Sequence, residues 1–396
     1  MTCRLLRVAT ALILSASLAG AAGSGELRVY PTPYYVIRSD LDEDLAREAA
    51  ARVTAMAEEY HQRTKSFAGS IRKKFDFYLF ARPQDYQAAG GRPGSPGMYV
   101  GQGKDGKLLV LAVSRGDLLW YIIQHEGFHQ FVHQVIGEDV PLWLNEGLAE
   151  YFGVAQWTGD GFVTGWMPPD KVARVKFYLR TGQILSFDKM LTLSNTDWRN
   201  RRDTLHYDQA WSMVHFLVHG MEGRFQPGFS AFIDSLGRGR DWKTAWTGNL
   251  PNLPILHKRY DEWWQAQDAG TGRLLWRKAM VATLTSYLAR AHLQGLEFQT
   301  ADDFLAAARA GRIENKPDTW LPPSLLERTL KKAAAHSPWT LDTKRQTPAL
   351  VLELTDGTVL RGSFSVTKGK IKTDVDIKPP TKTPAKPRQN ATEPSR

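Results

Sequence analysis

One pentapeptide limits the possible folds of this 396-residue chain more than any other feature. His125 and His129 flank Glu126 in the pattern HExxH, inside a helical periodicity that runs from Leu118 to a stop at Gly137. Histidines four residues apart lie one turn apart on one face of a helix, so their imidazoles can bind one ion. A chain of this composition would contain about 0.01 such matches by chance. The motif therefore predicts a metal site on a helix, with the glutamate beside a water on the ion.

A catalytic zinc ion usually has three protein ligands and one open position, so the fold must supply a third ligand. Glu146 is our candidate. A helix break at Gly137 and a restart at Pro141 would let a second helix fold back antiparallel, which brings Glu146 to the open side of the histidine pair. Glu150 can lie on the same face and accept the free ring N–H of a ligand histidine, and we place Asn145 in the same supporting role.

His133 is the other candidate for the third ligand. It follows His129 by four residues, but three histidines on one straight helix would span about 11–12 Å and could not converge on one ion. The pair His129 and His133 would also have Gln130 where a base is needed. We therefore interpret His133 as a packed or surface histidine. The alternative interpretation of Glu146 and Glu150 is a solvated helix face.

The cysteine usage restricts the chemistry further. Cys3 is the only cysteine and lies ahead of an apolar run, Val8 to Leu18, which follows Arg4 and Arg7. This pattern is typical of a secretory signal peptide, so we expect a secreted, periplasmic or envelope protein. The mature chain would have no thiol, which excludes cysteine nucleophiles, disulfides and thiolate metal sites. No later stretch reaches the ~18 apolar residues of a membrane helix.

The net charge of +10 is unevenly distributed. The signal segment contributes +2 and residues 368–396 contribute +5, which leaves +3 for the body of the protein. A nearly neutral body does not predict nucleic-acid binding. We expect the basic tail to be solvated or to contact an anionic envelope.

The periodicity of the chain predicts an α+β fold. A small mixed sheet with helices comes first, then a mostly helical half, then a helical and hairpin region that includes a hairpin from Leu350 to Leu360. We divide the chain into a signal peptide (1–22), an N-terminal α/β subdomain with an edge strand (26–115), a helical zinc-site subdomain (116–268), a C-terminal region of unassigned role (273–365) and a basic Pro/Lys-rich tail (366–396).

The HExxH motif and the downstream segment Trp143-Leu-Asn-Glu-Gly-Leu-Ala-Glu-Tyr-Phe152 resemble the gluzincin metallopeptidases. This resemblance implies a zincin-like fold and a zinc cofactor. It also implies His125, His129 and Glu146 as zinc ligands, with Glu126 as the general base. Sixteen residues separate His129 from Glu146, fewer than in the well-known members, so the loop between the helices must be shorter.

Within this class the metzincins do not fit, because Val132 stands where their motif needs glycine. The best overall resemblance is to an uncharacterised, secreted bacterial gluzincin-like family of unknown function, over roughly Tyr34 to Gln267.

The segment His206 to Leu217 is similar to the aminopeptidase-like Pro-Tyr-Glu-Lys-Gly helix, whose tyrosine donates a hydrogen bond to the oxyanion. The similarity implies this role for Tyr207. From the residues alone, an aromatic at a helix start with Trp211 and Val214 at core spacing is more typical of packing.

In gluzincins an edge strand ahead of the HExxH helix binds the substrate backbone, and Gly97, Met98 and Tyr99 occupy that place here. Pairing with a peptide depends on main-chain groups more than on particular side chains. The segment lacks the Gly-x-Met-x-Asn signature of aminopeptidases and its glutamate. No carboxylate is therefore evident to bind a substrate amino terminus, which disfavours an aminopeptidase.

Together these features predict a secreted zinc metallohydrolase that acts on a peptide or protein substrate, with Glu126 as base and Tyr207 at the oxyanion. Two alternatives remain. One is a non-catalytic zincin scaffold that binds a glycan or peptide at the envelope, although the intact base argues against it; its stacking platforms would be Trp242, Trp246, Trp263 and Trp264. The other is a structural zinc, which normally has four ligands rather than three.

Overall fold

The computed structural model describes residues 26–64, 71–101, 106–113, 116–137, 140–200 and 204–380. Within these residues the fold is mixed α+β, as predicted. The predicted signal peptide (1–22) and the last part of the predicted tail (381–396) lie outside the described residues. None of the described helices combines the length and the apolar composition that crossing a bilayer requires.

The first half of the protein is built on a five-stranded mixed sheet in the order β1-β2-β3-β5-β4. Strands β2, β3 and β5 are parallel, whereas β1 and β4 pair antiparallel at the two edges. The strands are β1 (Arg28–Pro31), β2 (Tyr35–Ser39), β3 (Phe75–Phe80), β4 (Gly97–Val100) and β5 (Lys107–Leu111). The predicted edge strand therefore lies at a sheet edge.

Two long helices, α1 (Glu43–Thr64) and α3 (Asp117–Phe131), lie together on one face of this sheet. The burial of β2 alternates residue by residue, because successive side chains of a strand point to opposite faces. Tyr35, Phe77 and Val110 are buried in the core beneath α1 and α3. A short helix, α2 (Pro83–Ala88), covers a smaller cluster on the other face.

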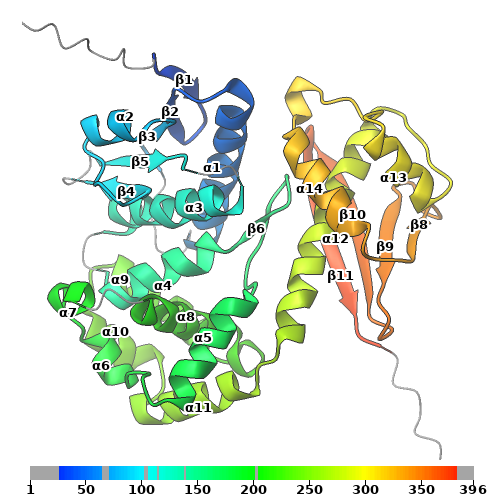
Figure 1. The fold of residues 1–396 in the computed structure, drawn as a ribbon. Coiled ribbons are helices and arrows are strands. Elements are labelled where there is room, and N and C mark those ends of the chain that lie inside the picture. The colour runs from blue at the N-terminus through cyan, green and yellow to red at the C-terminus, as the bar shows by residue number, and fades with distance from the viewer. Residues whose placement is uncertain are drawn as a thin grey trace, which may run out of the picture.

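The second half is mostly helical and packs below the sheet layer in Figure 1. Helix α4 packs closely against α8 and α3, which makes these three helices the centre of the molecule. The helices of this half are α4 (Leu142–Gly153), α5 (Pro169–Arg180), α6 (Phe187–Leu191), α7 (Asn195–Asn200), α8 (Leu205–Gly223), α9 (Gln226–Gly237), α10 (Trp242–Asn249) and α11 (Leu253–Ala266). Trp246 and Trp264 are buried in its core, so they do not offer the exposed faces that glycan stacking would need.

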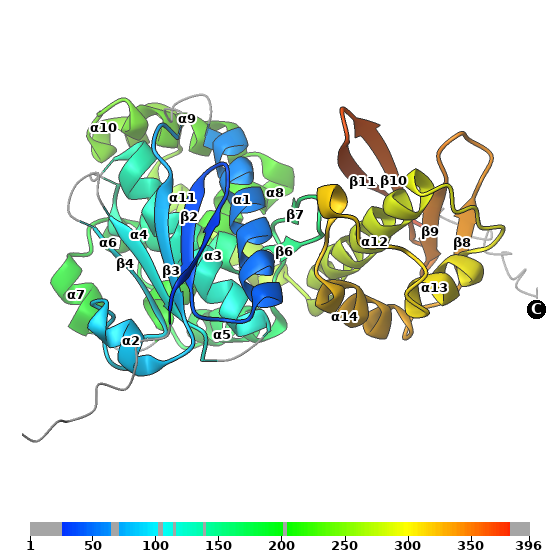
Figure 2. The same cartoon turned by 90° about the horizontal axis from the view of Figure 1, so that it is seen from above.

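A third part follows α12 (Ala269–Leu293) and forms a separate body in Figures 1 and 2. It contains an antiparallel sheet in the order β11-β10-β9-β8, packed on α12. Its other elements are α13 (Ala301–Arg309), a 3₁₀ turn (Pro317–Thr319), α14 (Pro323–Ala333), β8 (Trp339–Asp342), β9 (Ala349–Glu353), β10 (Val359–Thr367) and β11 (Lys370–Lys378).

This region differs from the sequence prediction at both of its boundaries. The predicted tail began at 366, but β10 reaches Thr367 and β11 pairs with it along its whole length. Lysine and aspartate alternate with isoleucine, threonine and valine in β11, so the strand has one charged face and one packed face. Because the segment is so highly charged, the sequence favoured a solvated tail. The predicted boundary between the regions 116–268 and 273–365 falls inside the first turn of α12, which runs without interruption into the C-terminal body.

A small hairpin and a buried ion pair are among the contacts that join the C-terminal body to the rest. Strands β6 (Gln156–Trp157) and β7 (Phe162–Val163) form the hairpin, which contacts α12. Asp160, in its turn, accepts two hydrogen bonds of 2.9 Å from the guanidinium of Arg290 on α12. Trp157 lies in the hydrophobic core of the C-terminal body. The hairpin therefore anchors the two parts to each other.

Candidate metal centre

The site is built on two antiparallel helices, α3 and α4. Helix α3 continues into a single π-helical segment, Val132–Ile136, and stops at Gly137, as the sequence predicted. The contacts between α3 and α4 show that the two helices run in opposite directions. His129 meets Asn145, and His125 meets Glu150. The restart at Pro141 therefore returns the chain antiparallel to α3.

Three donor atoms converge between these helices. Nε2 of His125 lies 3.2 Å from Nε2 of His129. Oε2 of Glu146 lies 3.6 Å from the first of these nitrogens and 3.4 Å from the second. A tetrahedral zinc site with bonds of about 2.0–2.1 Å places its ligand atoms about 3.3 Å apart. The three atoms thus form one face of a tetrahedron of the correct size.

The burial and charge of these groups also fit a cation. The side chains of both histidines are 11% exposed and that of Glu146 is 15% exposed. Oε2 of Glu146 is buried, and no donor among the described residues forms a hydrogen bond with it. A buried carboxylate oxygen without a donor is costly unless a positive charge faces it. Two imidazole nitrogens and one carboxylate oxygen are a donor set that zinc accepts. These residues can hold a metal ion.

The pKa values of His129 and Glu146 in the metal-free site reflect how close these groups lie to each other. Burial alone would lower the pKa of His129, but the carboxylate of Glu146 outweighs it and raises that pKa to about 9. Burial tends to raise the pKa of Glu146, yet the charges of His129 and His125 hold it below its ordinary value. A proton on His129 therefore occupies the place of the cation when no metal is bound.

Neighbouring oxygens orient both imidazoles. Oδ1 of Asn145 lies 2.9 Å from Nδ1 of His129 and accepts its hydrogen. Oε1 of Glu150 lies 3.4 Å from Nδ1 of His125. When Nδ1 carries the hydrogen, Nε2 has the free lone pair that a metal needs. Asn145 and Glu150 thus lie where the sequence placed them.

Sequence reasoning missed the residues that support Glu150. Lys171, on α5, donates a hydrogen bond of 2.6 Å to Glu150 and another of 3.1 Å to Asp208. The hydroxyl of Tyr121 donates to the other oxygen of Glu150. Burial tends to raise the pKa of Glu150, but Lys171 lowers it below its ordinary value. Arg174 binds both carboxylate oxygens of Asp208 and completes this network.

Glu126 points from α3 toward the edge strand. Its Oε2 accepts a hydrogen bond of 3.1 Å from the backbone N–H of Tyr99 on β4. A Cβ on Gly97 would lie 2.4 Å from Ile122 and 3.1 Å from Glu126, so only glycine lets the strand lie this close to α3. The structure therefore brings the HExxH glutamate and the predicted edge strand together. Met98 lies between Gly97 and Tyr99 on β4 and lines the adjoining cavity.

Two cavities meet at this site. One has a volume of about 530 Å³ and is lined by the start of β4, by Tyr121 and by residues of α5. The other has a volume of about 400 Å³ and is lined by the rest of β4, His129 and Glu146. His125, Glu126 and Tyr207 line both. The donor atoms thus lie at the middle of a cleft.

Tyr207 is half-buried in this cleft, at the start of α8. Burial, and then the nearby carboxylate of Glu146, raise its pKa above the ordinary value. Its hydroxyl therefore keeps its proton and can donate a hydrogen bond. His133, the rejected ligand, stacks its ring on that of Tyr99 with centroids 5.1 Å apart, and it does not belong to the group of converging donors.

The comparisons with known proteins give one family match, over the region that contains this site. No curated protein matches the chain. A family described as a protein of unknown function (DUF1570) matches residues 121–226. This range contains His125, His129, Glu146 and Tyr207, but not the edge strand or the C-terminal body. Over the helices that carry the converging donors, the chain is similar to an uncharacterised family.

Proposed function

We propose that this protein is an exported zinc peptidase of the gluzincin type. The observation that carries the proposal is the convergence of three donor atoms at tetrahedral spacing, open on the side that faces the cleft. The glutamate of the motif lies on the same open side, next to a sheet edge. A purely structural site would be closed by a fourth protein ligand, and the converging group has three members among the described residues.

The residues of the chain have distinct tasks in this proposal. When bound, zinc supplies Lewis acidity toward water and toward the scissile carbonyl. Glu126 takes a proton from the attacking water and delivers it to the leaving amine. Tyr207 donates its phenolic hydrogen to the oxygen that becomes negative. The edge strand β4 binds the substrate backbone and holds the scissile bond over the site.

The placement of Glu126 supports its role as base. In the absence of substrate, its carboxylate accepts the N–H of Tyr99. A peptide that pairs with β4 brings its own backbone groups to this edge, beside a carboxylate that already points into the cleft. Peptides are therefore a better fit to this site than small esters or amides, which lack an extended backbone to pair with the strand.

The test is the cleavage of a diverse peptide library by the mature protein, mapped by mass spectrometry. Glu126→Gln should retain zinc and lose turnover by at least about 100-fold, because it removes the proton acceptor and leaves the ligands intact. Zinc content is measured on the same samples by plasma mass spectrometry. The matched control is Glu262→Gln, a 64% exposed glutamate on α11, which should behave as wild type.

Two results would contradict the proposal. A zinc-loaded wild-type protein that cleaves no peptide of the library would refute the peptidase activity. A Glu126→Gln variant that is folded but has lost its zinc would refute the assignment of Glu126 as base rather than ligand.

A further inference from the structure

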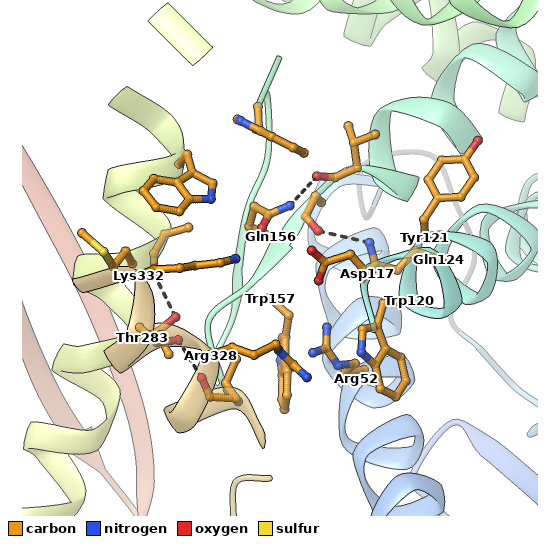
Figure 3. Close-up of a pocket in the computed structure, with 18 of the residues that line it drawn as sticks. Arg52, Asp117, Trp120, Tyr121, Gln124, Gln156, Trp157, Thr283, Arg328 and Lys332 are labelled. Atoms are coloured by element: carbon orange, nitrogen blue, oxygen red, sulfur yellow. Dashed lines mark hydrogen bonds between the residues drawn. The ribbon is translucent and has the colours of Figure 1, made fainter. Parts of the chain in front are cut away.

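A third cavity lies between the part of the protein that carries the candidate metal centre and the C-terminal body. It has a volume of about 250 Å³. Figure 3 shows Arg328, Lys332 and Thr283 on one side of it, and Asp117 and Tyr121 on the opposite side. The first three belong to α14 and α12, and the other two belong to α3. The cavity is therefore formed only when the two parts of the protein are joined.

Positive charge is in excess in this cavity. Arg52, Arg328 and Lys332 line it, and Asp117 is the only acidic residue among the described residues that line it. Arg52 donates two hydrogen bonds to Oε1 of the buried Glu48, and Arg328 lies 3.4 Å from the same oxygen. Two guanidinium groups thus share one carboxylate. Lys332 has no ion pair within 4 Å among the described residues, so the cavity carries one positive charge in excess of neutrality.

Aromatic rings hold these cations in place. The guanidinium of Arg52 lies between the rings of Trp120 and Trp157, 4.2 and 4.6 Å from their centroids. Nζ of Lys332 lies 5.5 Å from the ring of Trp276. A cation over an aromatic face is positioned without losing its charge. The cavity therefore offers fixed positive groups, together with apolar ring surface, to a ligand.

The cavity adjoins the catalytic cleft. Tyr121 and Val154 line both it and the larger of the two cavities at the metal centre. Tyr121 precedes His125 by one turn of α3, and Asp117 precedes it by two, which corresponds to about 6 and 12 Å along the helix. An extended peptide covers that distance in about two to four residues.

The direction of β4 determines which end of a peptide would reach the cavity. Gly97 lies against Ile122, and Tyr99 lies against His133, so β4 runs along α3 in the same direction. A peptide that pairs antiparallel with β4 runs the other way, and antiparallel pairing is the more stable arrangement. Its C-terminal part then passes the start of β4 and reaches Tyr121.

We propose that this interdomain cavity binds a carboxylate of the peptide substrate, two to four residues to the C-terminal side of the scissile bond. The inference rests on the proposed peptidase function for the position of the scissile bond, but the binding itself does not require turnover. The carboxylate comes from an acidic side chain or from the C-terminus of a short substrate. In either case it neutralises the positive charge that Lys332 leaves unpaired.

Binding is tested on the zinc-loaded Glu126→Gln protein, so that peptides are not consumed. The probes are fluorescein-labelled alanine- and serine-based decapeptides in which one glutamate or one glutamine is moved along the chain, each with a free or an amidated C-terminus. Fluorescence anisotropy gives the dissociation constants. Peptides with a glutamate at the favoured position should bind about five- to tenfold more tightly than their glutamine counterparts.

The second variant identifies the residue responsible. Adding Lys332→Gln should abolish the preference for glutamate, whereas adding Lys331→Gln should preserve it. Lys331 is the adjacent, exposed lysine of α14 and does not line the cavity, so the two variants have the same net charge. If C-terminal amidation, and not the change from glutamate to glutamine, weakens binding to the protein that retains Lys332, the carboxylate is the C-terminal one.

Affinities that neither the change to glutamine nor C-terminal amidation lowers, no binding of any peptide, or a carboxylate preference that survives Lys332→Gln would overturn the inference. The failure of the proposed function is a different result. In that case wild type cleaves no peptide although acidic peptides still bind in a manner that depends on Lys332. Cleavage without any acidic preference would refute the cavity site and leave the peptidase standing.

Discussion

At the scale of single residues, an oxygen lies on the far side of each imidazole of the candidate metal centre. Nδ1 of His129 and Nδ1 of His125 face the oxygens of Asn145 and Glu150. These oxygens keep both Nε2 atoms directed at the same point before a metal arrives. Lys171 in turn keeps Glu150 in its carboxylate form. Preorganisation of this kind reduces the reorganisation that metal binding would otherwise require.

The pH dependence of zinc affinity follows from His129. Its pKa is raised to about 9 in the metal-free protein, so it is protonated at neutral pH. Zinc must displace that proton, and affinity should therefore rise with pH, by about tenfold per pH unit up to about pH 9. Competition with a fluorescent chelator at several pH values between 6.5 and 8.5 would measure this slope. An affinity that does not change over this range would contradict the assigned protonation state.

The sequence predicts those site residues that lie on the same helix at helical spacing. His125 and His129 are four residues apart on one helix, and Glu146 and Glu150 are four apart on the next. Spacing alone could therefore place them on common faces. Lys171 and Asp208 belong to two further helices, and nothing in the sequence relates them to Glu150. Their meeting is a result of tertiary packing, and it was not found from the sequence.

At the scale of elements, the metal centre depends on how closely α4 approaches α8. The contact point is Gly147, next to the ligand Glu146. A Cβ at this position would lie 2.6 Å from the carbonyl oxygen of Ala210 and 2.8 Å from Val214. Both of these residues are on α8, the helix that begins near Tyr207. Gly147 thus sets the distance between the metal ligands and the proposed oxyanion donor.

Gly147→Ala should push the two helices apart. The expected loss in the free energy of unfolding is about 1–3 kcal/mol, because backbone and a branched side chain must both move. Urea denaturation monitored by circular dichroism would measure it. Gly248→Ala is the matched control, since that glycine is in α10 with no atom within 4 Å of the added methyl group. The control should be neutral or stabilised by up to about 1 kcal/mol. A Gly147→Ala protein as stable as wild type would show that this contact is not tight.

The sequence predicted the elements whose ends carry strong local signals. Gly137 and Pro141 bracket the turn between α3 and α4, and both act as expected. The start of α12 was missed, because its glycines favoured a boundary between two regions of the chain. Gly272 is there for packing instead, since a Cβ would lie 2.5 Å from the carbonyl oxygen of Met167. The sequence alone does not distinguish a glycine that close packing requires from a glycine in a flexible linker.

At the scale of the whole molecule, one buried ion pair connects the two bodies. The side chains of Asp160 and Arg290 are 11% and 5% exposed. Arg290 also donates to the carbonyl oxygen of Thr319, beyond α12. The pair thus ties the hairpin of β6 and β7 to two segments of the C-terminal body. The interdomain cavity depends on this junction for its shape.

Asp160→Ala should lower the free energy of unfolding by about 3 kcal/mol, because it leaves the buried Arg290 without its counter-ion. Chemical denaturation measures the change. Asp234→Ala serves as the control, since its partner Arg238 is 65% exposed, and its removal should cost at most about 1 kcal/mol. Equal losses in the two variants would mean that the junction contributes no more than an ordinary surface pair.

Helix α12 has a consequence for how this protein can change over time. Its 25 residues form a rod of about 37 Å, fixed to Met167 at Gly272 and to the C-terminal sheet where Thr285 meets Gly362. One residue inserted between these points would rotate the C-terminal body by about 100° and carry Arg290 away from Asp160. Seven inserted residues would bring the rotation back to within about 20°, but they would also move the C-terminal body about 10 Å along the helix axis. The length of α12 therefore fixes both the rotation and the distance between the two bodies, and the ion pair of Asp160 and Arg290 is kept only when neither changes.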